Sequence, residues 1–298
     1  MTSELTVSEE TITQACTAHE QAHWDERDYR RCLVIEQYFI KFNEYDVLEP
    51  EVMTQMYVSQ YAESDASAPR VPKVLHFFKT RYMGYLVMDY INLTSPPDLH
   101  SRAAEALQWL RNVPLPRDHV GIGPLGNGFA RHRLFKDFIA PLHFSSTEAL
   151  ERYLNKALTK RPRTATPIAP VVLRGERLVF IQSDVDISNF GVDHEGKTVL
   201  LDFGDVGILS ESFASYTMNS MNAFTGAVAG CLDWPKTSNL TSMSVARQIL
   251  WMYYDPTLGL DNDGNPKGNP PYNTHRLRVS KHTRGVLSDE FAGYTARI

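Results

Sequence analysis

The sequence predicts an α+β fold of two lobes, in which a small β-rich lobe is followed by a larger, mainly helical lobe. Before residue 92, three runs rich in β-branched and aromatic residues have the composition of strands. After residue 97 the predicted elements are mostly helices, with one short β-rich region between them. We expect residues 1–90 to form the first lobe and residues 91–298 to form the second.

The composition indicates a folded protein without a strongly charged partner. The chain has 298 residues, 43% of them hydrophobic, with 30 Lys and Arg against 35 Asp and Glu, which gives a net charge of −5. This balance excludes a disordered chain and offers no electrostatic footprint for nucleic acid or an anionic membrane. Three cysteines exclude a disulfide framework, and the acidic N-terminus resembles no targeting signal. We therefore expect a cytoplasmic protein.

The first lobe should contain three strands and one helix. A polar, proline-bearing stretch at residues 63–72 predicts a loop after the helix. The helix is expected over Glu49–Ala62, with Pro50 near its start. The strands are expected at Leu33–Phe42, Lys73–Phe78 and Tyr85–Ile91.

The second lobe should contain helices around a short β-rich region. Ser146 precedes one predicted helix and is followed by acidic residues, which the helix dipole favours in a first turn. A turn at residues 194–197 joins the last two predicted strands, and the Gly- and Pro-rich residues 255–273 predict a long loop. The helices are expected at Leu99–Val113, Ser146–Leu158 and Glu211–Asn222, and the strands at Arg177–Gln182, Phe190–Asp193 and Thr198–Asp202.

Three residues of the β-rich region, Asp184, Asn189 and Asp202, point to chemistry. Asp202 opens an Asp-Phe-Gly triplet directly after a predicted strand. Phosphoryl transfer needs an oriented acceptor and cations on the phosphate oxygens, with little covalent help from the protein. Asp184 is the candidate base, and Asn189 and Asp202 are the candidate Mg²⁺ ligands. Each aspartate alone fits an ordinary turn, but the joint spacing around a hairpin favours the functional interpretation.

With these residues the chain resembles the protein-kinase-like superfamily, and within it the aminoglycoside phosphotransferase and choline kinase branch. It is more similar still to fungal kinase-like proteins, which the stretches GPLGNGFARHRLFKDFIAP and SSTEALERYLNKAL also resemble. The similarity extends from about Leu33 to Met218. It implies a bilobal protein-kinase-like fold with ATP and Mg²⁺ as cofactors.

The resemblance also implies roles for residues of the first lobe and the segment after it. Lys41, in YFIKF, matches the lysine that contacts the α- and β-phosphates, and Glu51 matches the helix glutamate that pairs with it. The backbone at Asp89 and Ile91 matches the hinge that hydrogen-bonds adenine, beside Met88. These five residues are therefore the expected nucleotide site.

The chain departs from the family pattern at several places. Residues 1–83 contain no glycine, so no glycine-rich phosphate loop is present. Gln182 and Ser183 replace the His-Gly or His-Arg that usually precedes the catalytic aspartate, and Asp186 replaces a histidine. No Ala-Pro-Glu motif follows Asp202, which argues for a small-molecule substrate over a protein.

The sequence therefore predicts an ATP- and Mg²⁺-dependent phosphotransferase that acts on a hydroxyl group of a small molecule. Asp186 and Asp205, next to the candidate catalytic residues, motivate the expectation of an amine-bearing acceptor. A pseudokinase that binds a nucleotide or a partner without transferring phosphate is the alternative, because the glycine loop is missing. Nucleotidyl transfer is a third possibility on this fold. No pattern identifies the acceptor or the oligomeric state.

A G-x-G-x-x-G pattern at residues 121–126 suggests a dinucleotide site but lacks the required context. No strand is expected before it and no helix directly after it, and Pro124 interrupts the turn. We interpret the segment as a loop.

Overall fold

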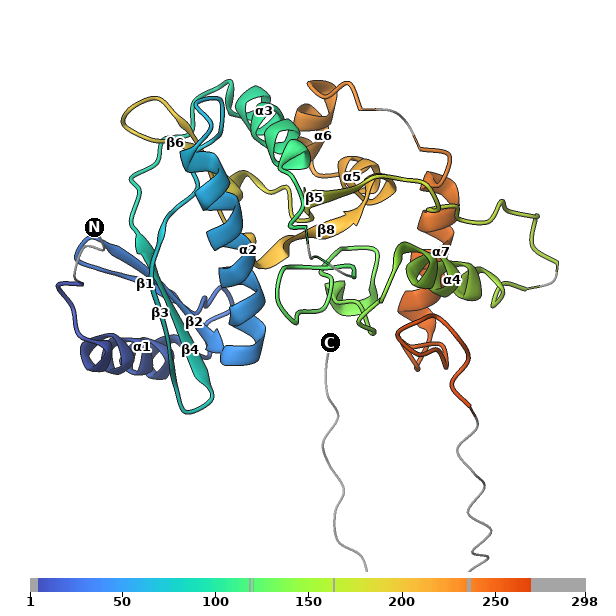
Figure 1. Ribbon diagram of the computed structural model, residues 1–298, viewed down its shortest axis with the longest axis horizontal. Helices are drawn as coiled ribbons and strands as arrows, with labels where there is room; N and C mark the ends of the chain where they lie inside the picture. Colours follow the sequence, from blue (N-terminus) through green and yellow to red (C-terminus); the bar gives the residue numbers. More distant parts are fainter. Residues whose placement is uncertain (1–4, 118, 120, 163, 235–236, 269–298) are drawn as a thin grey trace, which may run out of the picture. The chain divides into compact units, whose positions relative to one another are not determined.

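Two lobes follow one another along the chain in the computed structural model, which describes residues 5–117, 119, 121–162, 164–234 and 237–268 (Figure 1). The α+β class predicted from the sequence is confirmed. A four-stranded antiparallel sheet, in the order β1-β2-β4-β3, forms the smaller lobe together with two helices. Its strands are β1 (Cys32–Ile35), β2 (Tyr38–Glu44), β3 (Val74–Thr80) and β4 (Met83–Asp89).

The two helices of the smaller lobe cover opposite faces of the sheet. Side chains alternate between the faces of a strand, so Ile40 and Phe42 point to one side of β2 and Lys41 to the other. The helix α1 (Glu9–His23) packs on the first face, and α2 (Tyr45–Glu63) packs on the second. The position of Lys41 in this alternation directs its side chain toward α2.

The prediction of one strand over Leu33–Phe42 was wrong, because the chain turns back within it. Ile35 pairs with Tyr38, and the two residues between them form the turn of a β1–β2 hairpin. Glu36 adopts a φ of +52° there, a conformation usually taken by Gly or Asn. The sequence carries no such residue at the turn, and so it gives no hairpin signal.

Helices of the smaller lobe also differ from the prediction. The helix predicted over Glu49–Ala62 begins earlier, at Tyr45, so that Pro50 lies in its second turn. The helix α1 was not predicted; Ser8 caps it by accepting a hydrogen bond from the backbone of Thr11, and its first turn is acidic. Ile12 and Cys16 of α1 are buried against the sheet.

The larger lobe consists of five helices and two small antiparallel sheets in the described residues. Strand β5 (Leu178–Gln182) pairs with β8 (Val206–Ser210), and β6 (Phe190–Val192) pairs with β7 (Thr198–Leu200). Gly196 takes a φ of +81° in the turn between β6 and β7. The helices are α3 (Leu99–Asn112), α4 (Thr147–Leu158), α5 (Glu211–Met218), α6 (Ala223–Gly230) and α7 (Leu240–Met252).

Two predicted helices of this lobe are confirmed and a third is shorter than predicted. The helices α3 and α4 agree with the prediction, and Ser146 caps α4 by accepting a hydrogen bond from the backbone of Ala149. The helix predicted over Glu211–Asn222 ends at Met218, and the side chain of Asn222 instead caps α6. Strand β8 and helices α6 and α7 were not predicted.

Two loop predictions concern segments outside these elements. Residues 255–268 contain no helix or strand, as predicted, whereas residues 269–273 lie outside the described part. Gly123 of the G-x-G-x-x-G segment joins β8 by exchanging backbone hydrogen bonds with Ile208, at 2.9 and 2.7 Å.

No described helix is long and apolar enough to cross a membrane.

Candidate active site

The ammonium group of Lys41 lies between two carboxylates that come from distant parts of the chain. Its Nζ is 2.7 Å from Oε1 of Glu51 and 2.8 Å from Oδ1 of Asp202. The side chain of Glu51 is only 7% exposed, compared with 27% for Lys41 and 40% for Asp202. The structure thus brings together a strand, the helix α2 and the Asp-Phe-Gly segment at one cation.

The electrostatics of these three groups favour charge on Lys41 and Asp202. Burial acts to lower the pKa of Lys41, but the nearby Glu51 and Asp202 carboxylates outweigh it and raise this pKa. Burial likewise opposes ionisation of Asp202, yet Lys41 lowers the pKa of this carboxyl overall. For Glu51 burial prevails and raises the pKa, although Lys41 opposes it. The carboxyl of Asp202 is therefore ionised at neutral pH.

Local backbone geometry places Asp202 beside Glu51. Asp202 adopts the left-handed conformation, with a φ of +54°, and its Oδ1 accepts a hydrogen bond from the backbone of Gly204 at 3.3 Å. A Cβ atom on Gly204 would lie 3.1 Å from Oε2 of Glu51. The absence of a side chain at position 204 therefore lets α2 approach this turn closely.

Gln182 links the loop of Asp184 to the Asp-Phe-Gly segment. Its Nε2 donates to the backbone oxygen of Asp202 at 2.8 Å, and its Oε1 accepts from the backbone N–H of Asp184 at 3.1 Å. Gln182 is buried, so both bonds are shielded from water. The sequence showed this residue only as a departure from the family; the structure shows that one side chain holds both aspartates in register.

Asp184 and Asn189 also contact each other directly. Nδ2 of Asn189 donates to the backbone oxygen of Asp184 at 2.9 Å and lies 3.4 Å from its Oδ2. Burial raises the pKa of Asp184, and the charges of Asp205 and Asp186 raise it further. A carboxylate with a raised proton affinity is suited to accept a proton from an acceptor hydroxyl.

The oxygens left over in this site fit a hard cation. Among the described contacts, Asp202 uses Oδ1 for Lys41 and Gly204, while Asn189 donates through its nitrogen. Oδ2 of Asp202 and Oδ1 of Asn189 therefore remain as ligands of the kind that Mg²⁺ prefers. Within the described residues, no three His, Cys, Asp or Glu side chains form a metal site of their own. Phosphate and water oxygens would complete the coordination.

The predicted adenine-binding residues lie at the end of β4 and just beyond it. Met88 and Ile91 are largely buried. The backbone N–H of Asp89 donates to Lys73, so a hydrogen bond from Asp89 to adenine would use its carbonyl oxygen. The Asp89 side chain pairs with Arg70 at 2.8 Å, and Arg70 also pairs with Asp193 at 3.1 Å. Sequence analysis did not single out Arg70, since its partners are distant in the chain.

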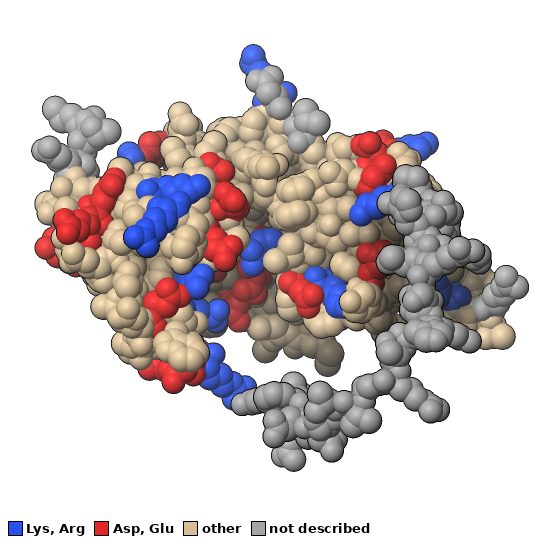
Figure 2. Space-filling model, turned by 90° about the horizontal axis from the view of Figure 1, so that it is seen from below, with Lys and Arg blue, Asp and Glu red and all other residues tan. Residues whose placement is uncertain are grey.

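Positive charge lies where the segment before β1 approaches the site. The β1–β2 turn contains only two residues, so this hairpin provides no long phosphate loop. Burial raises the pKa of the Cys32 thiol, while Lys41 and Arg30 lower it and Asp202 raises it. These three charged groups therefore act on the Cys32 thiol at the start of β1. Figure 2 shows basic and acidic side chains along the middle of one face, where the smaller lobe meets the larger.

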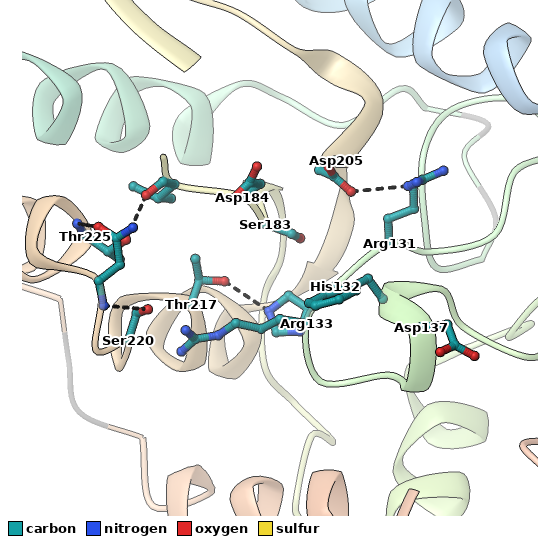
Figure 3. A pocket seen from close by; sticks show the side chains of 13 residues that line it. Arg131, His132, Arg133, Asp137, Ser183, Asp184, Asp205, Thr217, Ser220 and Thr225 are labelled. Carbon is teal, nitrogen blue, oxygen red and sulfur yellow. Dashed lines mark hydrogen bonds and ion pairs between the residues drawn. The ribbon is translucent and has the colours of Figure 1, made fainter. Parts of the chain in front are cut away.

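A cavity of about 410 Å³ opens next to Asp184 (Figure 3). Asp184 and Ser183 form one wall, and Arg131, His132 and Arg133 come from the segment between α3 and α4. The segment after α5 completes the lining with polar side chains. The cavity lies in the larger lobe.

Comparisons with known proteins find likeness only at the level of solved structures. No family model and no curated protein matches the chain. The aminoglycoside phosphotransferase APH(4)-Ia is similar over 80% of this chain and 90% of its own, at 13% identity and a TM-score of 0.47. A protein named as a fructosamine-3-kinase, from Haemophilus somnus 129PT, is similar over 82% of this chain and 90% of its own, at 10% identity and a TM-score of 0.45. Aminoglycoside 2'-phosphotransferase-IIIa, solved with GDP, is similar over 80% and 87%, at 11% identity and a TM-score of 0.44.

Proposed function

We propose that this protein transfers the γ-phosphoryl group of ATP, with Mg²⁺, to a hydroxyl group of a small molecule. The observation that carries this proposal is the placement of Lys41 between Glu51 and Asp202, with Asp184 tied to the same segment through Gln182. Phosphoryl transfer needs a fixed cation and a carboxylate oxygen ligand on one side of the site and a base on the other.

Each residue has a defined part in the proposed reaction. Lys41 binds the α- and β-phosphate oxygens, while Asp202 and Asn189 hold Mg²⁺, which neutralises phosphate charge when bound. Asp184 orients the acceptor hydroxyl and accepts its proton. The acceptor oxygen forms a bond to the γ-phosphorus as the bond to the β,γ-bridging oxygen breaks, and ADP leaves. The backbone at Asp89 and Ile91 is proposed to hold adenine beside Met88.

Thermal unfolding with and without Mg²⁺-ATP tests the nucleotide site. Ligand that binds only the native state stabilises it by RT ln(1 + [L]/Kd), about 2.7 kcal/mol at a hundredfold excess over Kd. We expect a Mg²⁺-dependent shift that is lost in Asp202→Asn and kept in Asp98→Asn, an exposed aspartate of the larger lobe. No shift in the wild type at millimolar ATP contradicts the proposal.

A second candidate, a nucleotide-binding pseudokinase, is favoured by one observation: the two-residue β1–β2 turn in place of a phosphate loop. Product analysis separates the candidates. ADP formation that Asp184→Asn abolishes, while the ATP-induced shift persists, supports the phosphotransferase. A shift without any turnover supports the pseudokinase, and AMP or pyrophosphate as product supports nucleotidyl transfer.

The expectation of an amine-bearing acceptor depends on the acids near Asp184. In the structure, Arg131 pairs with Asp205 at 3.2 Å, and Asp186 accepts from the backbone and hydroxyl of Ser188 at 3.0 and 2.8 Å. Asp205 therefore has a counter-charge, whereas Asp186 has neutral hydrogen-bond donors as its described partners. An amine-bearing acceptor therefore remains a proposal.

A further inference from the structure

Arg133 is a cationic side chain of the cavity beside Asp184 without a carboxylate partner. Its guanidinium donates to the backbone oxygens of Tyr216 and Asn219, at the end of α5, and lies 5.1 Å from the Tyr216 ring. Among the described residues, no carboxylate is within ion-pair distance of it. Carbonyl oxygens satisfy hydrogen bonds but do not neutralise a full charge.

Two buried polar atoms at the cavity also lack partners among the described residues. One is Nε of Arg133, which can only donate, and the other is Oγ of Ser183, whose residue is 8% exposed. Buried polar groups are nearly always hydrogen-bonded, since leaving one unsatisfied costs about 1–3 kcal/mol. The cavity wall at Arg133 therefore carries a positive charge that no described carboxylate neutralises.

The acids of the cavity do not compensate Arg133. Asp205 pairs with Arg131 at 3.2 Å. Asp137 is exposed, and Figure 3 shows it on the opposite side of His132 from the guanidinium of Arg133. Burial lowers the pKa of Arg133, and the nearby positive charge of Arg247 also lowers it. The lining of the cavity therefore includes the positive charge of Arg133 as well as the acidic side chain of Asp184.

We infer that this cavity binds an acceptor carrying an anionic group, a carboxylate or a phosphate, at Arg133, with the hydroxyl to be phosphorylated at Asp184. The inference rests on the proposed function and names the acceptor class for that reaction. Arg131 also lines the cavity, where its guanidinium pairs with Asp205. Charge-assisted hydrogen bonds from a guanidinium to an oxyanion are among the strongest in proteins.

Four hexoses that differ mainly in charge test the inference: glucose, glucosamine, glucuronate and glucose 6-phosphate. A volume of about 410 Å³ corresponds to roughly a dozen water molecules, so it can hold a ring of this size. ADP release is measured with Mg²⁺-ATP and each compound. We expect kcat/KM for at least one anionic compound to exceed that for glucose and glucosamine by about tenfold or more.

Arginine variants then assign the effect to the cavity. Arg133→Met should remove the preference for the anion, Arg133→Lys should restore part of it, and Arg174→Met, at an exposed arginine of the same lobe, should leave it unchanged. Comparing kcat/KM for glucuronate with that for glucose 6-phosphate shows whether the cavity prefers a carboxylate or a phosphate group on the acceptor.

Three outcomes overturn the inference. In the first, glucosamine has the highest kcat/KM; in the second, all four compounds have the same kcat/KM or none is phosphorylated. In the third, Arg133→Met changes only the KM for ATP. These results leave the proposed function standing if ATP still produces its Mg²⁺-dependent thermal shift and some acceptor is phosphorylated. Absence of that shift in the wild type contradicts the proposed function itself.

Discussion

The side chain of Gln182 donates a hydrogen bond to the backbone oxygen of Asp202 at 2.8 Å, and its Oε1 accepts one from the backbone N–H of Asp184 at 3.1 Å. Gln182 is buried and bonded at both ends, so its side chain links the segments of the two aspartates.

Replacing Gln182 should therefore impair catalysis more than nucleotide binding. Gln182→Met removes the donor and the acceptor but keeps the volume, and we expect kcat to fall by about 10- to 100-fold, because the aspartates lose their mutual register. The free energy of unfolding should fall by about 1–3 kcal/mol, since buried backbone groups lose partners. Gln14→Met, on the exposed surface of α1, is the control for both measurements. An unchanged kcat contradicts this role.

Lys41 and Glu51 should be strongly coupled in stability. Lys41→Met leaves Glu51 buried without its cation. We expect the free energy of unfolding to fall by about 3 kcal/mol or more, because breaking a buried ion pair leaves a buried charge uncompensated. The double variant Lys41→Met/Glu51→Leu should recover part of this loss. Denaturant unfolding of the four proteins in this cycle gives the coupling energy.

A surface ion pair provides the matched comparison for that cycle. Lys73 and Glu63 are 3.0 Å apart, and both are mostly exposed. Exposed pairs contribute about 0–1 kcal/mol. Equal coupling energies for the two pairs would show that Lys41 stabilises Glu51 no more than an exposed ion pair does.

The raised pKa of Asp184 should appear in the pH dependence of the reaction. A base must be deprotonated to act, so kcat falls as the pH decreases through this pKa, and a raised pKa places the fall at higher pH than for an ordinary carboxylate. The neighbouring charge of Asp205 contributes to that shift. Asp205→Asn should therefore move the fall to lower pH. Asp137→Asn, at another acid of the same cavity, should not move it.

His132 should make the protein less stable in acid. Its ring is fully buried, and Nδ1 accepts from the backbone of Leu134, so the proton resides on Nε2, which faces Thr217 at 3.0 Å. Burial lowers the pKa of His132 from 6.5 to about 3. Between these two values the unfolded chain binds a proton that the native protein does not, and stability therefore decreases as the pH falls.

The expected slope is about 1.4 kcal/mol per pH unit from this one residue in the window from about pH 6.5 to pH 3. Other groups also titrate there, so the measured quantity is the difference between wild type and His132→Gln, which keeps a donor without a titrating ring. Parallel stability curves for the two proteins would contradict the assignment. His194, which is exposed, provides a control substitution.

Part of the site could be predicted from the sequence because its residues are close together in the chain. Asp184, Asn189 and Asp202 lie around one hairpin, whereas the pairing of Lys41 with Glu51 was expected only from the resemblance to the kinase-like family. The roles proposed for these residues stay predictions, since geometry alone does not measure them.

Other features depend on contacts that sequence spacing does not reveal. Arg133 meets the end of α5 more than eighty positions away, and Gln182 reaches Asp202 across two strands. The β1–β2 turn carries a positive φ at Glu36 with neither Gly nor Asn to mark it. Helix α1 has a weak apolar face, with Ile12 and Cys16 as its buried residues, so its periodicity gave little signal.

The double ion pair of Arg70 has a consequence for motion within the molecule. It joins Asp89, where the smaller lobe ends, to Asp193 in the β6–β7 hairpin of the larger lobe, and the Asp193 side chain is fully buried. Rotation about the connection between the lobes must stretch these charge-assisted bonds. If the proposed nucleotide site opens by such a rotation, the two ion pairs oppose it, and because Asp193 is buried, added salt should weaken them less than it weakens an exposed pair.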